Sequence, residues 1–359
     1  MLPDAPIGRR ALLAGAAATA ASVGAAACSA PRREPVAEQP PAGQPAAGQP
    51  AAGPVGPVVH QPGIVSPPLP AVVLTAYDAT AADRPALTRA LRELARSVPA
   101  AVVTVALGAS LFDGRYGLSR PRLLTTMPEF PGDVLDPSWC HGDVLVQAAA
   151  TDARALRLPA IPGLRQRWRI DGFHPRDRGA GVRNLFGFRE GAGNPEAADP
   201  ALMNDLVWVQ PGDGEPAWCT GGSYLTVRLI RLAMSSWERE PRDEQERVFG
   251  RDRDTGAPLG QGDVDYAADP DGRRIALDAH VRRANPGTAE SQRHRILRRG
   301  WSYRRGEDAG QIFTCYQRDV ERGFAAIQQR LTGEALAKYL LPFGGGYYFV
   351  PAADRLSLG

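Results

Sequence analysis

One acidic residue stands alone in a glycine-rich stretch of this 359-residue chain. Glu190 lies in GVRNLFGFREGAGNPEAADP, residues 181 to 200, after an apolar and aromatic run and between Gly187 and Gly191. A carboxylate can take a proton from a bound molecule and return it, and glycines let the backbone come close to that molecule. Glu190 is therefore a candidate acid–base residue, against the simpler interpretation of an acid that flanks a helix.

A second feature is a group of ten arginines between Arg273 and Arg305. A solvated basic surface would explain the arginines, but apolar residues such as Leu297 and Trp301 lie among them and indicate partial burial. Buried guanidinium groups need carboxylates or a bound anion. A ligand that carries two carboxylates on an apolar plate, as haem does, meets this need.

Haem also requires an axial ligand, which proteins commonly supply as histidine. The chain has five candidates: His60, His141, His174, His280 and His294. His60 falls in a tether, where a histidine is usually solvated, and His294 lies between two arginines. His280, in LDAHVRRANP, has aliphatic neighbours and then a basic turn that Asn285 and a proline bring to an end. We favour His280, although its spacing alone fits a core or surface role as well.

Two sets of predicted elements must position these residues. Residues 71–77, 101–108 and 142–150 are predicted strands and 83–98 a helix; the second set covers 221–240, 310–331 and 344–351. We predict an α+β fold of two halves, each an antiparallel sheet with helices on one face, as in ferredoxin-like domains. Residues 241–309 are expected to be a long functional excursion, since idle loops of that length are uncommon.

The composition limits the classes of partner. Hydrophobic residues make up 43% of the chain and charged residues 23%, which is ordinary for a globular protein of one or two domains. The net charge of +3 is too small to predict binding to nucleic acid by bulk attraction. Cys140, Cys219 and Cys315 are widely spaced, so we expect buried small side chains and no disulfide framework.

The first 68 residues are expected to lie outside the fold. Residues 1–30 place Arg9 and Arg10 before an alanine-rich apolar stretch and resemble a twin-arginine export signal. Cys28 could carry a lipid anchor after cleavage, so secreted, periplasmic and membrane-anchored forms stay open. Residues 31–68 repeat Ala-Gly-Gln-Pro units and are expected to form a linker. The predicted halves are then 69–220, which carries Glu190, and 221–359, which carries His280.

Several separated motifs, in order along the chain, together resemble the dye-decolorizing peroxidases, particularly their exported, deferrochelatase/peroxidase-like branch. They are NLFGFREGAGNP, GRDRDTGAPLG, AHVRRANP, RILRRGWSYRRG and IFTCYQRD. The resemblance runs from about residue 68 to 353. It implies two ferredoxin-like domains in a dimeric α+β barrel-like fold that binds haem b. It further implies a peroxidase that reduces hydrogen peroxide and oxidises a small phenolic or dye-like donor. The oligomeric state stays open.

The resemblance also implies roles for individual residues. His280 matches the axial haem ligand and Arg298 the distal arginine, with Arg299 as the alternative if the match is shifted by one residue. Further residues expected at the cofactor are Gly187, Phe188, Gly191, Arg282 and Asn285. The acceptor for the second ring nitrogen of His280 is left between Asp319 and a backbone carbonyl.

The sequence departs from the family at the acid of the Gly-x-x-acid-Gly motif, where Glu190 replaces the usual aspartate. In the family this acid moves a proton between the two oxygens of peroxide. The additional methylene would carry the carboxylate into the peroxide site or back onto Arg298 as an ion pair. If Glu190 is badly placed, Glu190→Asp should raise the rate.

Two other functions stay open. An exported haem-binding protein or deferrochelatase in iron uptake, with iron-uptake components as partners, would keep the haem site with low peroxidase activity. A chlorite-dismutase-like enzyme is the weaker alternative, because it would need a distal arginine without the Gly-x-x-acid-Gly motif.

Overall fold

The computed structural model describes residues 58–175, 181–260 and 265–356. The predicted export signal, Cys28 and most of the predicted linker lie outside these ranges. The strands are β1 (Ala71–Ala79), β2 (Val102–Gly108), β3 (Val144–Ala150), β4 (Leu164–Phe173), β5 (Ser223–Leu232), β6 (Leu297–Arg305), β7 (Asp308–Gln317) and β8 (Leu340–Val350). The α-helices are α1 (Arg84–Ala95), α2 (Pro200–Leu206), α3 (Met234–Trp237), α4 (Arg242–Phe249), α5 (His280–Ala284), α6 (Ala289–Arg293) and α7 (Ala326–Leu331).

The strands form a closed antiparallel barrel in the order β1-β3-β2-β8-β5-β7-β6-β4. The order β4-β1-β3-β2 in the first half recurs as β8-β5-β7-β6 in the second, which is the strand order expected of two ferredoxin-like units. Short contacts of β2 with β8 and of β4 with β6 join the halves. The predicted α+β fold is confirmed, while the boundary between residues 220 and 221 stays a prediction.

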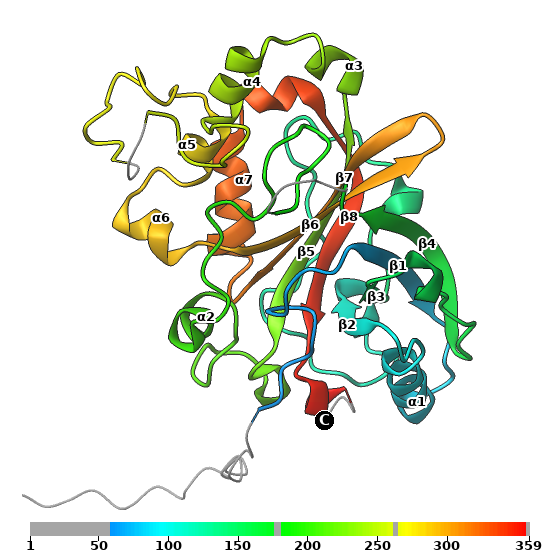
Figure 1. Cartoon of the computed structure of the whole chain (residues 1–359). Coiled ribbons are helices and arrows are strands. Elements are labelled where there is room, and N and C mark those ends of the chain that lie inside the picture. The colour runs from blue at the N-terminus through cyan, green and yellow to red at the C-terminus, as the bar shows by residue number, and fades with distance from the viewer. Residues whose placement is uncertain (1–57, 176–180, 261–264, 357–359) are drawn as a thin grey trace, which may run out of the picture. The chain divides into compact units, whose positions relative to one another are not determined.

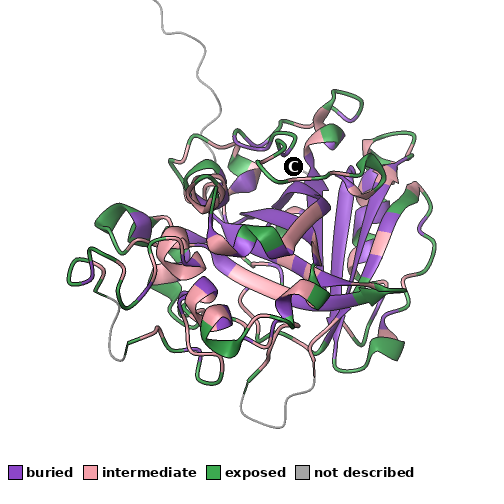
Figure 2. Cartoon of the chain, turned by 90° about the horizontal axis from the view of Figure 1, so that it is seen from above, coloured by how far each residue is buried: buried purple, intermediate pink, exposed green. Residues whose placement is uncertain are grey.

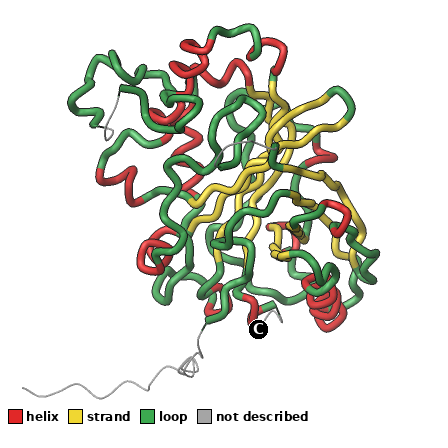
Figure 3. The backbone as a smooth tube through the Cα atoms, in the orientation of Figure 1, coloured by secondary structure: helices red, strands yellow, loops and turns green. Residues whose placement is uncertain are grey.

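Alternation along the strands separates the inside of the barrel from its outside. In β1, Val72 and Leu74 belong to the interior cluster, whereas Val73 packs with α1 on the outer face. Helix α1 begins after Asp83, whose carboxylate accepts a hydrogen bond of 2.7 Å from the amide of Ala86. Strands are buried and helices lie at the periphery (Figures 2 and 3), so the barrel is a rigid support for surface sites.

Two strands escaped the sequence prediction. Strand β4 alternates buried residues such as Trp168 and Ile170 with arginines, and its first residues are mostly exposed, so the apolar signal is weak. Strand β6 lies in the arginine-rich segment predicted as an excursion. That segment, residues 241–309, also contains α4, α5 and α6, so the prediction of one long excursion is wrong. Its described residues pack on the second half of the barrel.

The predicted linker ends too late in the chain. Gln61 and Ile64 are 4% and 1% exposed, and the amide of Gln61 donates to the carbonyls of Val105 and Pro351 at 2.9 Å. His60, expected to be solvated, stacks on Trp208 with ring centroids 3.8 Å apart. Residues 58–69 are therefore a strap against the barrel. Their prolines and small residues hid this role, because burial there comes from contacts with distant strands.

The three cysteines of the described chain, Cys140, Cys219 and Cys315, are free and buried, as predicted. Within the described ranges no helix has both the length and the apolar character needed to cross a membrane.

Candidate functional site

A cavity of about 460 Å³ lies against the outer face of the second half of the barrel. Its walls come from β5, β6, β7 and β8, from α5 and α7, and from the loop between β4 and α2, which crosses over from the first half (Figure 1). Six residues predicted from the sequence line it: Phe188, Glu190, Gly191, His280, Asn285 and Arg298. The tertiary structure therefore brings together two motifs that lie about ninety residues apart in the chain.

The side-chain alternation of β6 decides between the two candidate arginines. Arg298 faces the cavity, where its Nη2 donates to the carbonyl of Ala192 at 2.7 Å. Arg299 does not line the cavity, and its guanidinium donates instead to the carbonyls of Ile64 and Ser66 in the strap. Neighbours in a strand point to opposite faces, so only one of the two can serve this site. Arg298 is that residue.

Glu190 is held by a short hairpin. The amide of Glu190 donates to the carbonyl of Val182 at 2.8 Å, and the amide of Asn184 donates to the carbonyl of Phe188 at 2.9 Å. Gly191 follows with φ of +77°, a conformation that residues with a Cβ atom disfavour. The reversal at Gly191 ends the hairpin and leaves the Glu190 side chain at the cavity.

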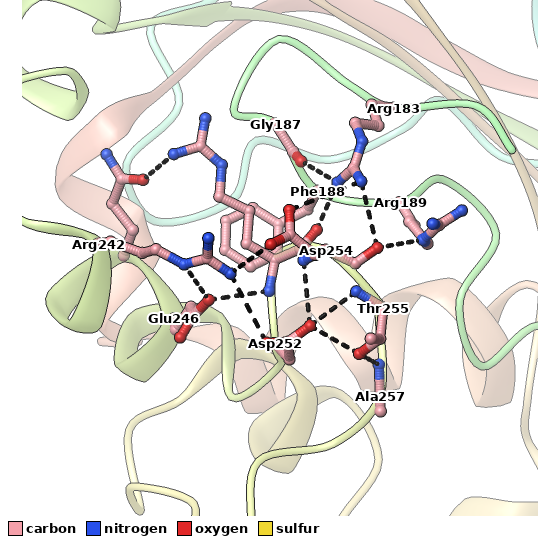
Figure 4. Close-up of polar contacts among 12 residues, drawn as sticks. Arg183, Gly187, Phe188, Arg189, Arg242, Glu246, Asp252, Asp254, Thr255 and Ala257 are labelled. Carbon is pink, nitrogen blue, oxygen red and sulfur yellow. Dashed lines mark hydrogen bonds and ion pairs between the residues drawn. The ribbon is translucent and has the colours of Figure 1, made fainter. Parts of the chain in front are cut away.

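The loop GRDRDTGAPLG fastens this hairpin from the other side, as Figure 4 shows. Arg183 and Arg189 of the hairpin donate to the backbone carbonyls of Arg253 and Asp254. Asp252 keeps the loop in its turn by accepting hydrogen bonds from the amide and hydroxyl of Thr255 at 2.7 and 2.6 Å. Through these contacts the motif supports the position of Glu190.

The carboxylate of Glu190 has a partner of its own. Oε1 accepts a hydrogen bond of 2.9 Å from Nε2 of Gln311 in β7. Gly300 of β6 makes room for both side chains, since a Cβ there would lie 2.5 Å from Gln311 Nε2 and 3.2 Å from Glu190 Oε2. In the described chain Glu190 forms no ion pair with Arg298, contrary to one of the two outcomes expected from the sequence. The longer side chain is accommodated by a matching donor and a matching gap.

Burial shifts the ionisation of both catalytic candidates. The protein around Glu190 raises the pKa of its carboxyl group, while the hydrogen bond from Gln311 and the charge of Arg298 oppose that rise. Burial lowers the pKa of Arg298, and the negative charge of Glu190 opposes that change. A carboxyl group whose pKa lies above its usual range is suited to accept and release protons.

His280 opens α5 and lines the same cavity. Its Nδ1 lies 2.6 Å from Oε2 of Glu334, whose side chain is only 5% exposed. A carboxylate at Nδ1 fixes the ring and leaves Nε2 for a ligand. Glu334 is thus the acceptor, and neither Asp319 nor a backbone carbonyl takes this position; Asp319 instead accepts from the amides of Glu321 and Arg322. No local sequence signal marked Glu334, which lies 54 residues from its partner.

Two of the predicted cofactor residues do not line the cavity. Gly187 packs against the guanidinium of Arg253. Arg282 forms an ion pair with Asp269 at 3.0 Å and lies over the ring of Tyr266. Both residues therefore lie outside the cavity wall and contact residues around it. Asn285 does line it, and its side-chain oxygen accepts from the hydroxyl of Ser291 at 2.7 Å.

The remaining histidines lie elsewhere. Nε2 of His174 donates a hydrogen bond of 2.8 Å to the carbonyl of Gly300, and the ring stacks on Trp301. Burial lowers the pKa of both His141 and His174. His294 lines a second cavity, described below. His280 is the one histidine among the lining residues of the first cavity.

The first cavity combines an apolar wall with positively charged side chains. Its apolar wall includes Ile230, Phe249 and Leu336, and its cations include Arg251 and Arg295, which have no carboxylate partner in the described part of the chain. No cluster of three or more metal-ligating side chains occurs among the described residues, so His280 can offer a metal one protein ligand. Haem, which brings its own ring of nitrogen ligands and two carboxylates, suits this combination.

Comparison with known families agrees with this geometry. Residues 181–355 match the model of the Dyp-type peroxidase C-terminal domain, and residues 99–157 match that of the N-terminal domain. The C-terminal match begins at the hairpin that carries Glu190. The chain belongs to the Dyp-type peroxidase family.

Individual relatives place the chain within that family. It is 47% identical over 271 residues to the deferrochelatase of Escherichia coli (strain K12), an alignment that covers 69% of this chain and 64% of that protein. The chain thus spans less than two thirds of the curated relatives it matches. It is 33% identical to a DyP-type peroxidase from Cellulomonas bogoriensis, covering 86% of this chain and 100% of that one with a TM-score of 0.73. Ferric DtpA from Streptomyces lividans is 32% identical, with 84% and 95% covered and a TM-score of 0.74.

Proposed function

We propose that this protein is a haem b peroxidase that reduces hydrogen peroxide and oxidises a small phenolic or dye-like donor. The observation that carries the proposal is the convergence of the His280–Glu334 pair, Glu190 and Arg298 on one cavity. Membership of the Dyp-type peroxidase family supports the same proposal. Haem, when bound, would supply the iron at which the O–O bond of peroxide breaks.

His280 would hold the iron through Nε2, since Nδ1 is engaged by Glu334 at 2.6 Å. A carboxylate on the far nitrogen increases the electron-donating character of a ligating imidazole. Arg251 and Arg295 would meet the carboxylates of the cofactor, because both line the cavity without a carboxylate partner among the described residues.

Glu190 would move the proton that peroxide cleavage requires. Its carboxylate accepts the proton from one oxygen of hydrogen peroxide and returns it to the other, so that water leaves rather than hydroxide. Arg298 lines the same cavity and supplies a fixed positive charge for the negative charge that develops on oxygen. The raised pKa of Glu190 favours acceptance of the proton from peroxide.

A second candidate function rests on the relatives named deferrochelatase, which are 47% identical to this chain. In that case the cavity would hold haem as cargo in an iron-uptake system, with partners from that system, and the peroxide reaction would be incidental. Residues 1–30 favour export by the twin-arginine route under either function, with Cys28 as a potential lipid anchor.

One experiment separates the two functions. The purified haem-loaded protein is mixed with hydrogen peroxide in a stopped-flow spectrometer, and the Soret band is followed. A peroxidase shows a rapid spectral change that Glu190→Gln slows strongly, whereas a haem carrier keeps its spectrum under the same conditions. His280→Ala is the control for the site itself and should lose most haem during purification; full retention would remove His280 from the site.

A further inference from the structure

A second cavity, of about 750 Å³, lies beside the first, and apart from Arg295, which both cavities share, its residues have no role in the function proposed above. Its walls come from α2, from the end of α6 and the residues after it, and from the segment that follows β7. Helices α2 and α6, which contribute residues to these walls, lie on the same side of the molecule in Figure 1. Gln292 and Arg295 line both cavities, so only this short segment separates them.

Most charges of this second cavity are neutralised within the protein. Arg318 binds Asp213 through two hydrogen bonds of 2.7 and 2.5 Å. Glu215 accepts a hydrogen bond of 2.6 Å from the hydroxyl of Tyr224 and another of 2.6 Å from the amide of Arg122. These contacts hold the walls together and leave those side chains unavailable as the main contacts of a ligand.

Three consecutive basic residues on one wall differ from this pattern. Arg293, His294 and Arg295 have no acidic partner within the ranges that the structure describes, and the guanidinium of Arg295 donates only to the carbonyl of Gln292, at 3.3 Å. Arginine pairs readily with carboxylates and sulfonates by two parallel hydrogen bonds. An arginine and a neighbouring histidine without an acidic partner, on the wall of a cavity of this size, are the arrangement expected of an anion-binding wall.

Apolar side chains complete the second cavity. Leu123 and Leu206 are buried and Leu202 is half-buried, and all three line it. We propose that the second cavity binds a small anionic aromatic molecule, whose ring contacts the leucines and whose carboxylate or sulfonate contacts Arg293 and His294, while Arg295 is left to the carboxylates of the cofactor. Neutral phenols lack the group that this wall recognises.

The role of this ligand rests on the proposed peroxidase function. Bound next to the cofactor cavity, a phenolic donor gives up one electron and one proton and becomes a phenoxyl radical. Two donors and two of their protons balance the reduction of one hydrogen peroxide to two waters. The second cavity would thus make the protein selective for anionic donors.

The test uses ferulate, an aromatic carboxylate with a phenol, and its uncharged methyl ester. Binding of each to the haem-loaded protein is measured by equilibrium dialysis without peroxide. We expect ferulate to bind more tightly than the ester, and Arg293→Ala with His294→Ala to weaken ferulate binding about tenfold or more while the ester is unaffected. Arg304→Ala, which removes an exposed arginine outside both cavities, is the matched control and should bind ferulate as the parent does.

Haem content and turnover complete the test. Neither Arg293 nor His294 lines the first cavity, so the double variant should keep its haem and its rate with guaiacol, a neutral donor. Equal ferulate affinity in the parent and the double variant would overturn the proposal, and so would loss of haem from that variant. If the parent does not react with peroxide but ferulate binding still depends on these residues, the peroxidase function fails and the binding site stands.

Discussion

Gln311→Met tests whether Gln311 tunes the proton-transfer residue. The substitution keeps the side-chain volume close to that of glutamine but removes the donor that lies 2.9 Å from Glu190 Oε1. That hydrogen bond lowers the pKa of Glu190 against the rise caused by burial. Losing it therefore raises this pKa further, and the carboxylate form becomes available only at higher pH.

The size of the effect follows from the contact. A hydrogen bond to an ionised group contributes about 1.5–3 kcal/mol, and the lower end applies here because Glu190 is half-buried and faces a cavity. On the acidic side of the profile, where the protonated fraction limits the rate, this predicts a fall of about tenfold in the rate with peroxide. At higher pH the carboxylate is ionised in both proteins, so the two rates should converge.

The assay is the second-order rate of the Soret change with hydrogen peroxide across pH. The acidic limb of the parent should lie above the usual range of a glutamate, and that of Gln311→Met higher still. Gln317→Met, on the same strand but bonded to the carbonyl of Tyr224, is the control for disturbing β7. Coincident profiles for the parent and Gln311→Met would refute the reasoning, as would an equal shift in Gln317→Met.

Three further predictions follow from the same contacts. Glu334→Gln should weaken haem retention about ten- to hundredfold, because His280 loses its charged partner. Haem transfer to apomyoglobin measures this, and an unchanged rate of transfer would show that Glu334 does not support the haem ligand. Arg298→Leu should keep haem but slow the reaction with peroxide by about a hundredfold or more. Arg299→Leu should leave that rate unchanged and lower the Tm, since Arg299 holds the strap. The reverse pattern would contradict the assignment of Arg298 to the cavity. Glu190→Asp retracts the carboxylate by about the length of one C–C bond, roughly 1.5 Å, and should break the contact with Gln311 and slow the reaction; a faster rate would instead support the sequence-based hypothesis that glutamate is badly placed.

The local sequence was sufficient to predict an element or a site residue where the segment itself carries the pattern or motif. The apolar alternation of residues 71–77 and the capped amphipathic pattern from Asp83 onward predicted β1 and α1. The motifs around Glu190, His280 and Arg298 identified these three residues, which all line one cavity. In each case the residues that decide the outcome are neighbours in the chain.

The segment of residues 241–309 shows where such signals fail. Its arginines concealed strand β6, because in β6 the stabilising contacts come from β7 and from the strap rather than from an apolar alternation of its own. The sequence predicts a linker where the strap lies because the contacts of the strap are also distant in the chain: Ile64 is buried by strands far from it in the sequence.

By itself, the sequence determined the α+β class, the family and the residues at the centre of the site. Only the tertiary structure decided that Arg298 rather than Arg299 faces the cavity, because strand alternation sets that direction. It also decided which partners these residues have: Gln311 for Glu190, in the gap left by Gly300, and Glu334 for His280. Hydrogen bonds act over about three ångströms in space, and a distance of that kind between residues 54 or 121 positions apart exists only once the chain has folded.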